Sequence, residues 1–139
     1  MLDFEKAIAL HPDKYIGYIG RGDCLRLTEK YEDAKAVYSK ALNLSKKNNI
    51  SLLLRRAICS IELKRYDPAF DDIEELLSHD PENSEALYFK GLIFNKQSKS
   101  LINVEMQNEA IICYEQAIKF NTNKKAVTRS IYEIAKIKI

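Results

Sequence analysis

Two histidines and three cysteines are the side chains of this sequence best suited to chemistry. His11 and His79 lie near predicted helix ends, and no serine, cysteine or aspartate stands at a spacing that would make a nucleophilic triad with them. We interpret both as partners of a helix C-terminal dipole. Cys24, Cys59 and Cys113 are odd in number, lie far apart and form no C-x-x-C pair. This pattern predicts reduced, buried thiols rather than a disulfide framework or a zinc site.

An acidic run and a glycine-rich run are the remaining candidates for a bound ion or nucleotide. Residues 71–75 (Asp-Asp-Ile-Glu-Glu) lie on a predicted helix and lack the glycine-turned loop that gathers calcium ligands, so we interpret them as a solvated face. Residues 17–22 (Gly-Tyr-Ile-Gly-Arg-Gly) fall inside a predicted helix and lack the G-x-G-x-x-G order of a phosphate-binding loop. The sequence therefore predicts no catalysis, no cofactor and no metal.

Composition indicates an all-α protein. Hydrophobic residues make up 46% of the 139 residues, Trp is absent, and the chain has only four Gly and three Pro. The net charge of +2 is too small for a dedicated nucleic-acid-binding domain. No stretch approaches the 18 or more uncharged apolar residues of a membrane span, and the first residues lack the pattern of a signal peptide. We therefore expect a soluble, cytoplasmic protein that does not enter a membrane.

A repeated pattern organises the chain. The run from Tyr31 to Leu42 is echoed thirty-five residues later from Tyr66 to Leu77, and again from Ala110 to Ile118. An earlier partial copy runs from Phe4 to Pro12, with Phe4 thirty-four residues before Tyr38. Apolar residues three and four apart place each copy on an amphipathic helix. The upstream halves also repeat: Tyr18-x2-Arg21-Gly22-x2-Leu25, Leu53-x2-Arg56-Ala57-x2-Ser60 and Leu87-x2-Lys90-Gly91-x2-Phe94. Each repeat is thus predicted to be a pair of helices, A followed by B.

At these residues the chain resembles the tetratricopeptide repeat family, in degenerate form. Leucine replaces the family's aromatic residue at positions 53 and 87, and Lys46 and Thr122 replace its proline. The resemblance implies a right-handed superhelical solenoid of antiparallel helix pairs, with about seven or eight helices in all. It also implies that small residues bring helices A and B close together and that larger ones fill the space between units. The small residues are Gly22, Ala57 and Gly91, facing Ala34, Ala69 and Ala110, and the larger ones are Tyr38, Ile73 and Tyr114.

The expected organisation is a single domain over residues 1–139, divided into repeats. Residues 1–14 match the second half of a repeat; three repeats span 15–49, 50–83 and 84–124, and residues 125–139 form a C-terminal capping helix. That helix should pack through an apolar edge of Val127, Ile131, Ile134 and Ile137. The third repeat contains a seven-residue insertion near 97–108, interpreted as a surface excursion or a docking segment. Because a lone second half would leave an apolar stripe uncovered, we expect the chain to be part of a longer array.

Charge is unevenly distributed along the sequence. Residues 71–85 are rich in Asp and Glu, whereas residues 119–138 carry six Lys or Arg against Glu133 alone. We interpret these runs as solvated helix faces, with a basic docking end as the alternative. Arg21, Arg56 and Lys90 recur with the repeat and should form a ladder whose charged ends reach water, or else contact an acidic partner.

The resemblance places the binding surface on the concave face lined by the A helices, where a partner's helix or extended segment would lie. Chaperone-binding members of the family hold a C-terminal carboxylate with Lys, Asn and Arg side chains on three A helices. The matching places here carry Ile19, Asp23, Arg55, Glu85 and Phe89, so we expect no such carboxylate clamp. The predicted groove residues are Ile19, Asp23, Arg26, Leu54, Arg55, Ile58, Glu62, Tyr88, Phe89, Leu92, Asn95 and Lys96.

The sequence therefore predicts a protein–protein interaction scaffold that binds a peptide or helix of a partner protein within a larger assembly, and not an enzyme. Two alternatives stay open. A single-stranded RNA reader built from helix pairs would use the basic end, although the weak overall charge and apolar groove oppose it. A regulatory domain of a larger enzyme is the other. The oligomeric state and the partner's identity do not follow from the sequence.

Overall fold

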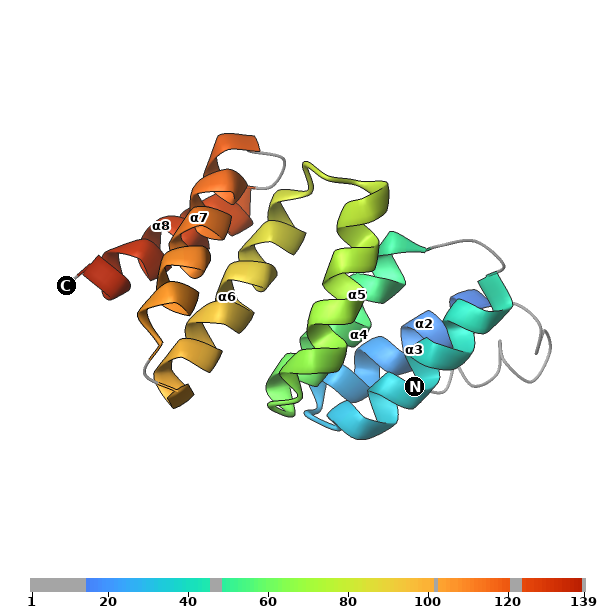
Figure 1. The fold of residues 1–139 in the computed structure, drawn as a ribbon. Helices are drawn as coiled ribbons and strands as arrows, with labels where there is room; N and C mark the ends of the chain where they lie inside the picture. Colours follow the sequence, from blue (N-terminus) through green and yellow to red (C-terminus); the bar gives the residue numbers. More distant parts are fainter. Residues whose placement is uncertain (1–14, 46–48, 102, 121–123, 139) are drawn as a thin grey trace. The chain divides into compact units, whose positions relative to one another are not determined.

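The computed structural model describes residues 15–45, 49–101, 103–120 and 124–138. The predicted half repeat at residues 1–14, with His11, lies outside these ranges. The described residues form seven α-helices and no strand, so the predicted all-α class is confirmed (Figure 1). The helices are α2 (Tyr15–Leu27), α3 (Tyr31–Ser45), α4 (Ile50–Glu62), α5 (Tyr66–His79), α6 (Ser84–Leu101), α7 (Val104–Phe120) and α8 (Lys124–Lys138). None of these helices combines the length and the apolar character needed to cross a membrane.

The chain divides into two compact units, residues 1–72 and 73–139, and each is described by itself. The boundary falls inside α5, so this helix contributes its first half to one unit and its second half to the other.

In the first unit, α2 packs against α3, and α3 packs against α4. The close approach of α2 and α3 depends on Gly22, because a Cβ atom there would lie 2.5 Å from Cε1 of the Tyr38 ring. Tyr38, Ala34 and Ala41 are fully buried in this interface. Their spacing of four and three residues places them on one side of α3, as the sequence pattern predicts.

The turns that end α2 and α4 share one geometry. Glu29 and Lys64 adopt the left-handed backbone conformation, with φ of 63° and 60°. The next amide in each turn donates back into the helix, from Lys30 to the Leu25 carbonyl and from Arg65 to the Ser60 carbonyl, each at 2.8 Å. This is a Schellman termination, which turns the chain sharply into the second helix of each pair. At the start of α4, the Asn49 side chain accepts from the Leu52 amide at 3.2 Å and caps the helix.

In the second unit, α6 and α7 form the longest helix pair, with 18 and 17 residues against 13 to 15 in the other helices. The seven-residue insertion is therefore built into the helices and does not form a surface excursion. Residues 97–108 contain no Gly or Pro to stop a helix. Asn103 makes the turn: its side-chain oxygen accepts from the amides of Glu105 and Met106, at 3.0 and 3.2 Å.

Helix α8 packs against α7 and α6, but through a different face from the predicted one. Ala126, Ser130 and Glu133 are the buried residues of this helix. Of the predicted apolar edge, Val127, Ile134 and Ile137 are only partly buried, and Ile131 is 54% exposed. The prediction is therefore wrong for Ile131, which remains exposed, and the most buried residues of α8 are Ala126, Ser130 and Glu133.

Candidate functional site

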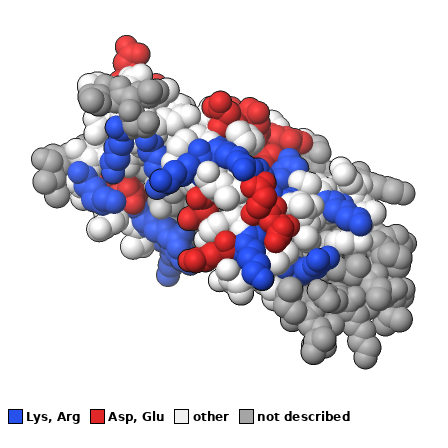
Figure 2. Space-filling model, turned by 90° about the horizontal axis from the view of Figure 1, so that it is seen from below, with Lys and Arg blue, Asp and Glu red and all other residues white. Residues whose placement is uncertain are grey.

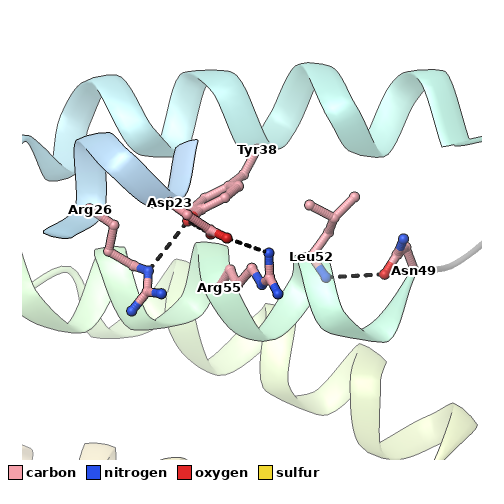
Figure 3. Close-up of polar contacts among 6 residues, drawn as sticks. All are labelled: Asp23, Arg26, Tyr38, Asn49, Leu52 and Arg55. Carbon is pink, nitrogen blue, oxygen red and sulfur yellow. Dashed lines mark hydrogen bonds and ion pairs between the residues drawn. The ribbon is translucent and has the colours of Figure 1, made fainter. Parts of the chain in front are cut away.

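A polar cluster joins three helices of the first unit (Figure 3). Asp23 on α2 accepts a hydrogen bond from the Tyr38 hydroxyl of α3 at 2.6 Å, through Oδ1. Its other oxygen, Oδ2, accepts from Nη1 of Arg55 on α4 at 2.8 Å. Arg26 Nε donates to the same Tyr38 hydroxyl at 3.3 Å. Three of the predicted groove residues, Asp23, Arg26 and Arg55, are thus brought together.

Tyr38 links the core of the unit to this surface. Its side chain is fully buried, and the ring crosses α2 at Gly22, so that the hydroxyl emerges beside Asp23 and Arg26. Burial raises the pKa of Tyr38, and the bond to Asp23 raises it further. The family resemblance implied only that Tyr38 fills space between units. Its second role, the hydrogen bond to Asp23, was signalled by the position of this acid directly after Gly22, where the ring crosses α2.

The surface around this cluster combines apolar and charged side chains. Asp23 and Arg55 keep about a third of their side chains exposed, at 30% and 31%. Arg26, Leu54 and Ile58 are also partly buried, and Glu62 at the end of α4 is exposed. Ile19 packs against the apolar core of the unit. Each predicted groove residue of α2 and α4 is therefore at least partly exposed, and Ile19 also contacts the core.

The predicted groove residues of α6 are less accessible. Tyr88 and Phe89 are each 7% exposed and stack edge to face, with ring centroids 5.0 Å apart. Tyr88 also lies 5.8 Å from the Tyr114 ring, and the Arg129 guanidinium of α8 lies 5.9 Å from its centroid. Asn95 is 2% exposed. On this helix Leu92 is partly buried and Lys96 is exposed, and these two offer the most surface to a partner.

A second polar cluster, which the sequence analysis missed, lies buried between α6, α7 and α8. Asn95 Nδ2 donates to Oε2 of Glu133 at 3.5 Å, and Lys136 Nζ lies 3.6 Å from the same oxygen. The Tyr114 hydroxyl lies near Asn95 and Glu133. Among the described residues, neither this hydroxyl nor the buried Ser130 Oγ has a well-formed hydrogen bond. Burial raises the pKa of Tyr114, and the nearby Glu133 raises it further. Only the placement of α8 brings Glu133 to Asn95, so no local sequence pattern could have revealed this cluster.

Two of the three recurring basic residues, Arg56 and Lys90, pair with carboxylates of the acidic run. Arg56 makes a two-pronged contact with Asp72, through Nε to Oδ2 at 2.9 Å and Nη2 to Oδ1 at 2.7 Å, while Nη1 donates to Ser39 at 3.2 Å. Lys90 pairs with Glu74 at 2.9 Å. The interpretation of residues 71–75 as a solvated face is therefore wrong for Asp72, which is 6% exposed. Basic and acidic side chains lie next to one another over the face seen in Figure 2.

The thiols have the character of core residues, with one exception. Cys59 and Cys113 are buried, whereas Cys24 is partly exposed, so the prediction of buried thiols is wrong for Cys24. Burial raises the pKa of Cys59 and of Cys113 to about 11. Among the described residues, no group of His, Cys, Asp and Glu is arranged to hold a metal ion.

Paired antiparallel helices, with small residues beneath a tyrosine and polar side chains on the first helix of each pair, define a tetratricopeptide-like helical repeat. Residues 17–48 match the family model described as tetratricopeptide repeat, and the resemblance drawn from the sequence is confirmed. The second tetratricopeptide domain of human RPAP3, solved in complex with the HSP70 peptide SGPTIEEVD, has a similar fold. Its TM-score is 0.69 at 26% identity, covering 88% of this chain and 92% of that one.

Two curated relatives are much longer than this chain. Human protein O-mannosyl-transferase TMTC3 is 29% identical over 109 residues, which are 78% of this chain and 12% of that protein. The Hsp70/Hsp90 co-chaperone CNS1 of Saccharomyces cerevisiae is 32% identical over 82 residues, which are 57% of this chain and 21% of that protein. The chain therefore spans about an eighth and a fifth of the length of these two relatives.

Proposed function

We propose that this chain is a protein-interaction module that binds a segment of a partner protein on the A-helix surface of its first unit, formed by α2 and α4. The observation that carries the proposal is the cluster of Asp23, Arg26 and Arg55 beside the partly exposed Leu54 and Ile58. A partner can bury apolar area there while its polar groups bond to side chains already held in place. The similar RPAP3 domain, solved with a bound peptide, supports a peptide or protein as the ligand class.

The ion pair between Asp23 and Arg55 prepares this surface for binding. It joins consecutive A helices, so it holds two parts of the surface in register before a partner arrives. Arg26 is oriented by the Tyr38 hydroxyl in the same way. Side chains fixed in this manner lose little conformational freedom on binding, which favours affinity.

The same cluster opposes a C-terminal carboxylate ligand. Asp23 already pairs with the charge of Arg55, and a second carboxylate about 4 Å from Asp23 would be repelled by about 1 to 4 kcal/mol at effective dielectric constants of 80 to 20. We therefore keep the expectation that this surface does not hold a peptide ending in Glu-Glu-Val-Asp as a clamp, although the RPAP3 domain was solved with such a peptide.

Titration with the peptide SGPTIEEVD tests this expectation. We expect weak binding by the native chain and at least about tenfold tighter binding by Asp23→Asn, because a neutral amide removes the repulsion and frees Arg55. Calorimetry at low salt measures both affinities. Tight binding by the native chain, unchanged in Asp23→Asn, would show that a carboxylate clamp operates without regard to Asp23.

The proposed surface itself is tested by Leu54→Asp combined with Ile58→Asp. We expect this double variant to lose the protein captured by the native chain, while its helical circular dichroism and thermal midpoint stay close to native. Ala36→Asp, on an exposed part of α3, is the matched control and should retain capture. Capture retained by the double variant would place the binding surface elsewhere.

A domain that recruits or regulates a larger enzyme is the second candidate. It is favoured by the similarity to 12% of a protein named as a mannosyl-transferase, since a repeat module can form a small part of such a chain. In that case the A-helix surface would still bind protein, and the chemistry would belong to another part of the molecule.

A further inference from the structure

Arg26 differs from Asp23 and Arg55, the other charged members of the polar cluster in the first unit, because its charge has no carboxylate partner. Asp23 and Arg55 form an ion pair at 2.8 Å. Arg26 uses only Nε, which donates to the Tyr38 hydroxyl at 3.3 Å. Among the described residues, its terminal nitrogens, Nη1 and Nη2, have no hydrogen bond or ion pair. The edge of the guanidinium that carries these two nitrogens is therefore free to bind an anion.

The free edge of Arg26 has a defined direction. The acceptor for Nε is the hydroxyl of the fully buried Tyr38, and Asp23 holds that hydroxyl in turn at 2.6 Å. Figure 3 shows the two terminal nitrogens directed away from Tyr38 and Asp23. Two such N–H groups side by side match the two oxygens of a carboxylate. Because Arg26 is already oriented, it loses little conformational freedom on binding one.

A large apolar side chain lies next to this edge. Leu27 is 75% exposed, more than any other large apolar residue among those described. It follows Asp23 by four residues, which places it one helical turn further along the face of α2 that carries Ile19 and Asp23. This end of α2 therefore offers an unpaired positive charge and exposed apolar area together.

We propose that the partner segment bound on the A-helix surface places an aspartate or glutamate side chain on the free edge of Arg26 and an apolar side chain on Leu27. This inference rests on the proposed function, because it names the chemistry of the segment that the surface binds. Arg26 is then the residue that specifies an acidic side chain. Leu54 and Ile58 supply apolar area that many different segments could cover.

A side-chain carboxylate on Arg26 avoids much of the repulsion that opposes a carboxylate beside Arg55. It lies on the far side of the guanidinium from Asp23, and Coulomb repulsion falls with distance and with screening by salt. A phosphate group, with nearly two negative charges, would be repelled more strongly by Asp23. A carboxylate is therefore the better match for one unpaired guanidinium.

The acids at this end of the first unit do not occupy the free edge. Glu32 pairs with Arg65 at 2.8 Å. Among the described residues, Glu29 and Glu62 are exposed and make no ion pair with Arg26. The proposed function makes a partner protein the source of the acid. Another segment of this chain and a second copy are the alternatives that the experiment separates.

Selection of displayed peptides tests this recognition without knowledge of the partner. A library of short random peptides is fused through the peptide C-terminus to a phage coat protein, so that no free C-terminal carboxylate is present, and is selected on the 139-residue chain. We expect Asp or Glu at one aligned position of the selected peptides, and Lys or Arg there with Arg26→Glu. Lys40→Glu, on an exposed part of α3, makes the same change in charge and should keep the acidic preference.

One selected peptide then measures the contact itself. It is synthesised with both ends blocked, in its acidic form and with the acid changed to the corresponding amide. We expect the amide form to bind the native chain about tenfold more weakly than the acidic form. Arg26→Gln should bind both forms equally, because the acid then has no partner. Fluorescence anisotropy at low salt measures the four affinities.

The outcomes separate this inference from the proposed function. Peptides that show no acidic preference, or keep it in Arg26→Glu, but lose binding in Leu54→Asp combined with Ile58→Asp would overturn the inference alone. Binding unaffected by that double variant, or no selected binder, would overturn both. Binding that appears only after removal of residues 1–14, or that competes with self-association of the chain, would identify the occupant as this chain or a second copy and would overturn the assignment to a partner.

Discussion

At the scale of single residues, the two tyrosines that cross a glycine are in different surroundings. The Tyr38 hydroxyl bonds to Asp23 and Arg26, whereas the Tyr114 hydroxyl is buried beside Asn95 without a well-formed hydrogen bond. The difference comes from the residue directly after the glycine, which is Asp23 in α2 and Leu92 in α6. The same repeat position is therefore polar in the first unit and apolar in the second.

This difference predicts opposite outcomes for one chemical change. Tyr38→Phe removes two hydrogen bonds to charged groups and should destabilise the chain by about 1.5 to 3 kcal/mol. Tyr114→Phe removes a buried hydroxyl without a good partner and should change stability by less than about 0.5 kcal/mol, or increase it. Urea denaturation followed by circular dichroism measures both changes. A loss in Tyr38→Phe as small as the one expected for Tyr114→Phe would mean that the Asp23 cluster adds nothing to stability.

The buried thiols predict a loss of stability in alkaline solution. The pKa of Cys59 and of Cys113 is raised from 9.0 to about 11 in the folded chain. As the pH rises past the unfolded pKa, the unfolded chain releases these protons first, which favours unfolding. The stabilisation is complete below about pH 9 and falls by about 1.4 kcal/mol per pH unit for each thiol between about pH 9 and pH 11.

Urea denaturation at about pH 8 and about pH 10 measures this slope. The variant with both Cys59→Ala and Cys113→Ala should show a flatter pH dependence than the native chain. An identical slope in the two proteins would show that these thiols titrate alike in the folded and unfolded chains.

At the scale of helices and turns, the paired Schellman terminations offer a test of the repeat. Glu29 and Lys64 hold left-handed backbone conformations that glycine adopts more easily. Glu29→Gly and Lys64→Gly should each stabilise the chain by about 0.5 to 1 kcal/mol, because the released strain exceeds the added entropy of the unfolded state. Lys30→Gly, one residue beyond the first of these positions, lacks this strain and should not stabilise the chain. Thermal denaturation distinguishes these outcomes, and destabilisation by both glycines would contradict the turn geometry.

The helices were predictable to different degrees. The amphipathic spacing around Ala34, Tyr38 and Ala41 was enough to place α3 and its buried face. The length of α6 and α7 was not predicted. Comparison with the other repeats shows seven additional residues, and additional residues between two helices usually indicate a longer loop. The capacity of residues 97–108 to continue a helix was the overlooked signal.

The buried face of α8 was also misjudged, for a reason that local sequence does not contain. Its isoleucines form the more hydrophobic stripe, but Ala126, Ser130 and Glu133 make the contact with α6 and α7. A helix in a repeat array is positioned by its register relative to the previous pair, and that register outweighs local hydrophobicity here. The exposure of Ile131 follows from this outcome.

At the scale of the whole molecule, the chain is a helical-repeat module whose surfaces differ between its two units. The first unit offers a polar cluster beside apolar side chains on α2 and α4. In the second, Tyr88, Phe89 and Asn95 are buried, so that much of the predicted groove on α6 is used within the unit. The sequence was sufficient for the family resemblance and the helix pairs, but the accessibility of individual groove residues depended on tertiary packing.

Site-specific photo-crosslinking tests the central claim most directly. A benzophenone amino acid at Ile58 on the A-helix surface is compared with the same group at Ala36 on the exposed part of α3. We predict that a partner protein is crosslinked from Ile58 and not from Ala36, and that the crosslinked residues of the partner form one contiguous segment. Equal crosslinking from both positions, or crosslinking from Ala36 alone, would contradict the proposal that α2 and α4 form the binding surface.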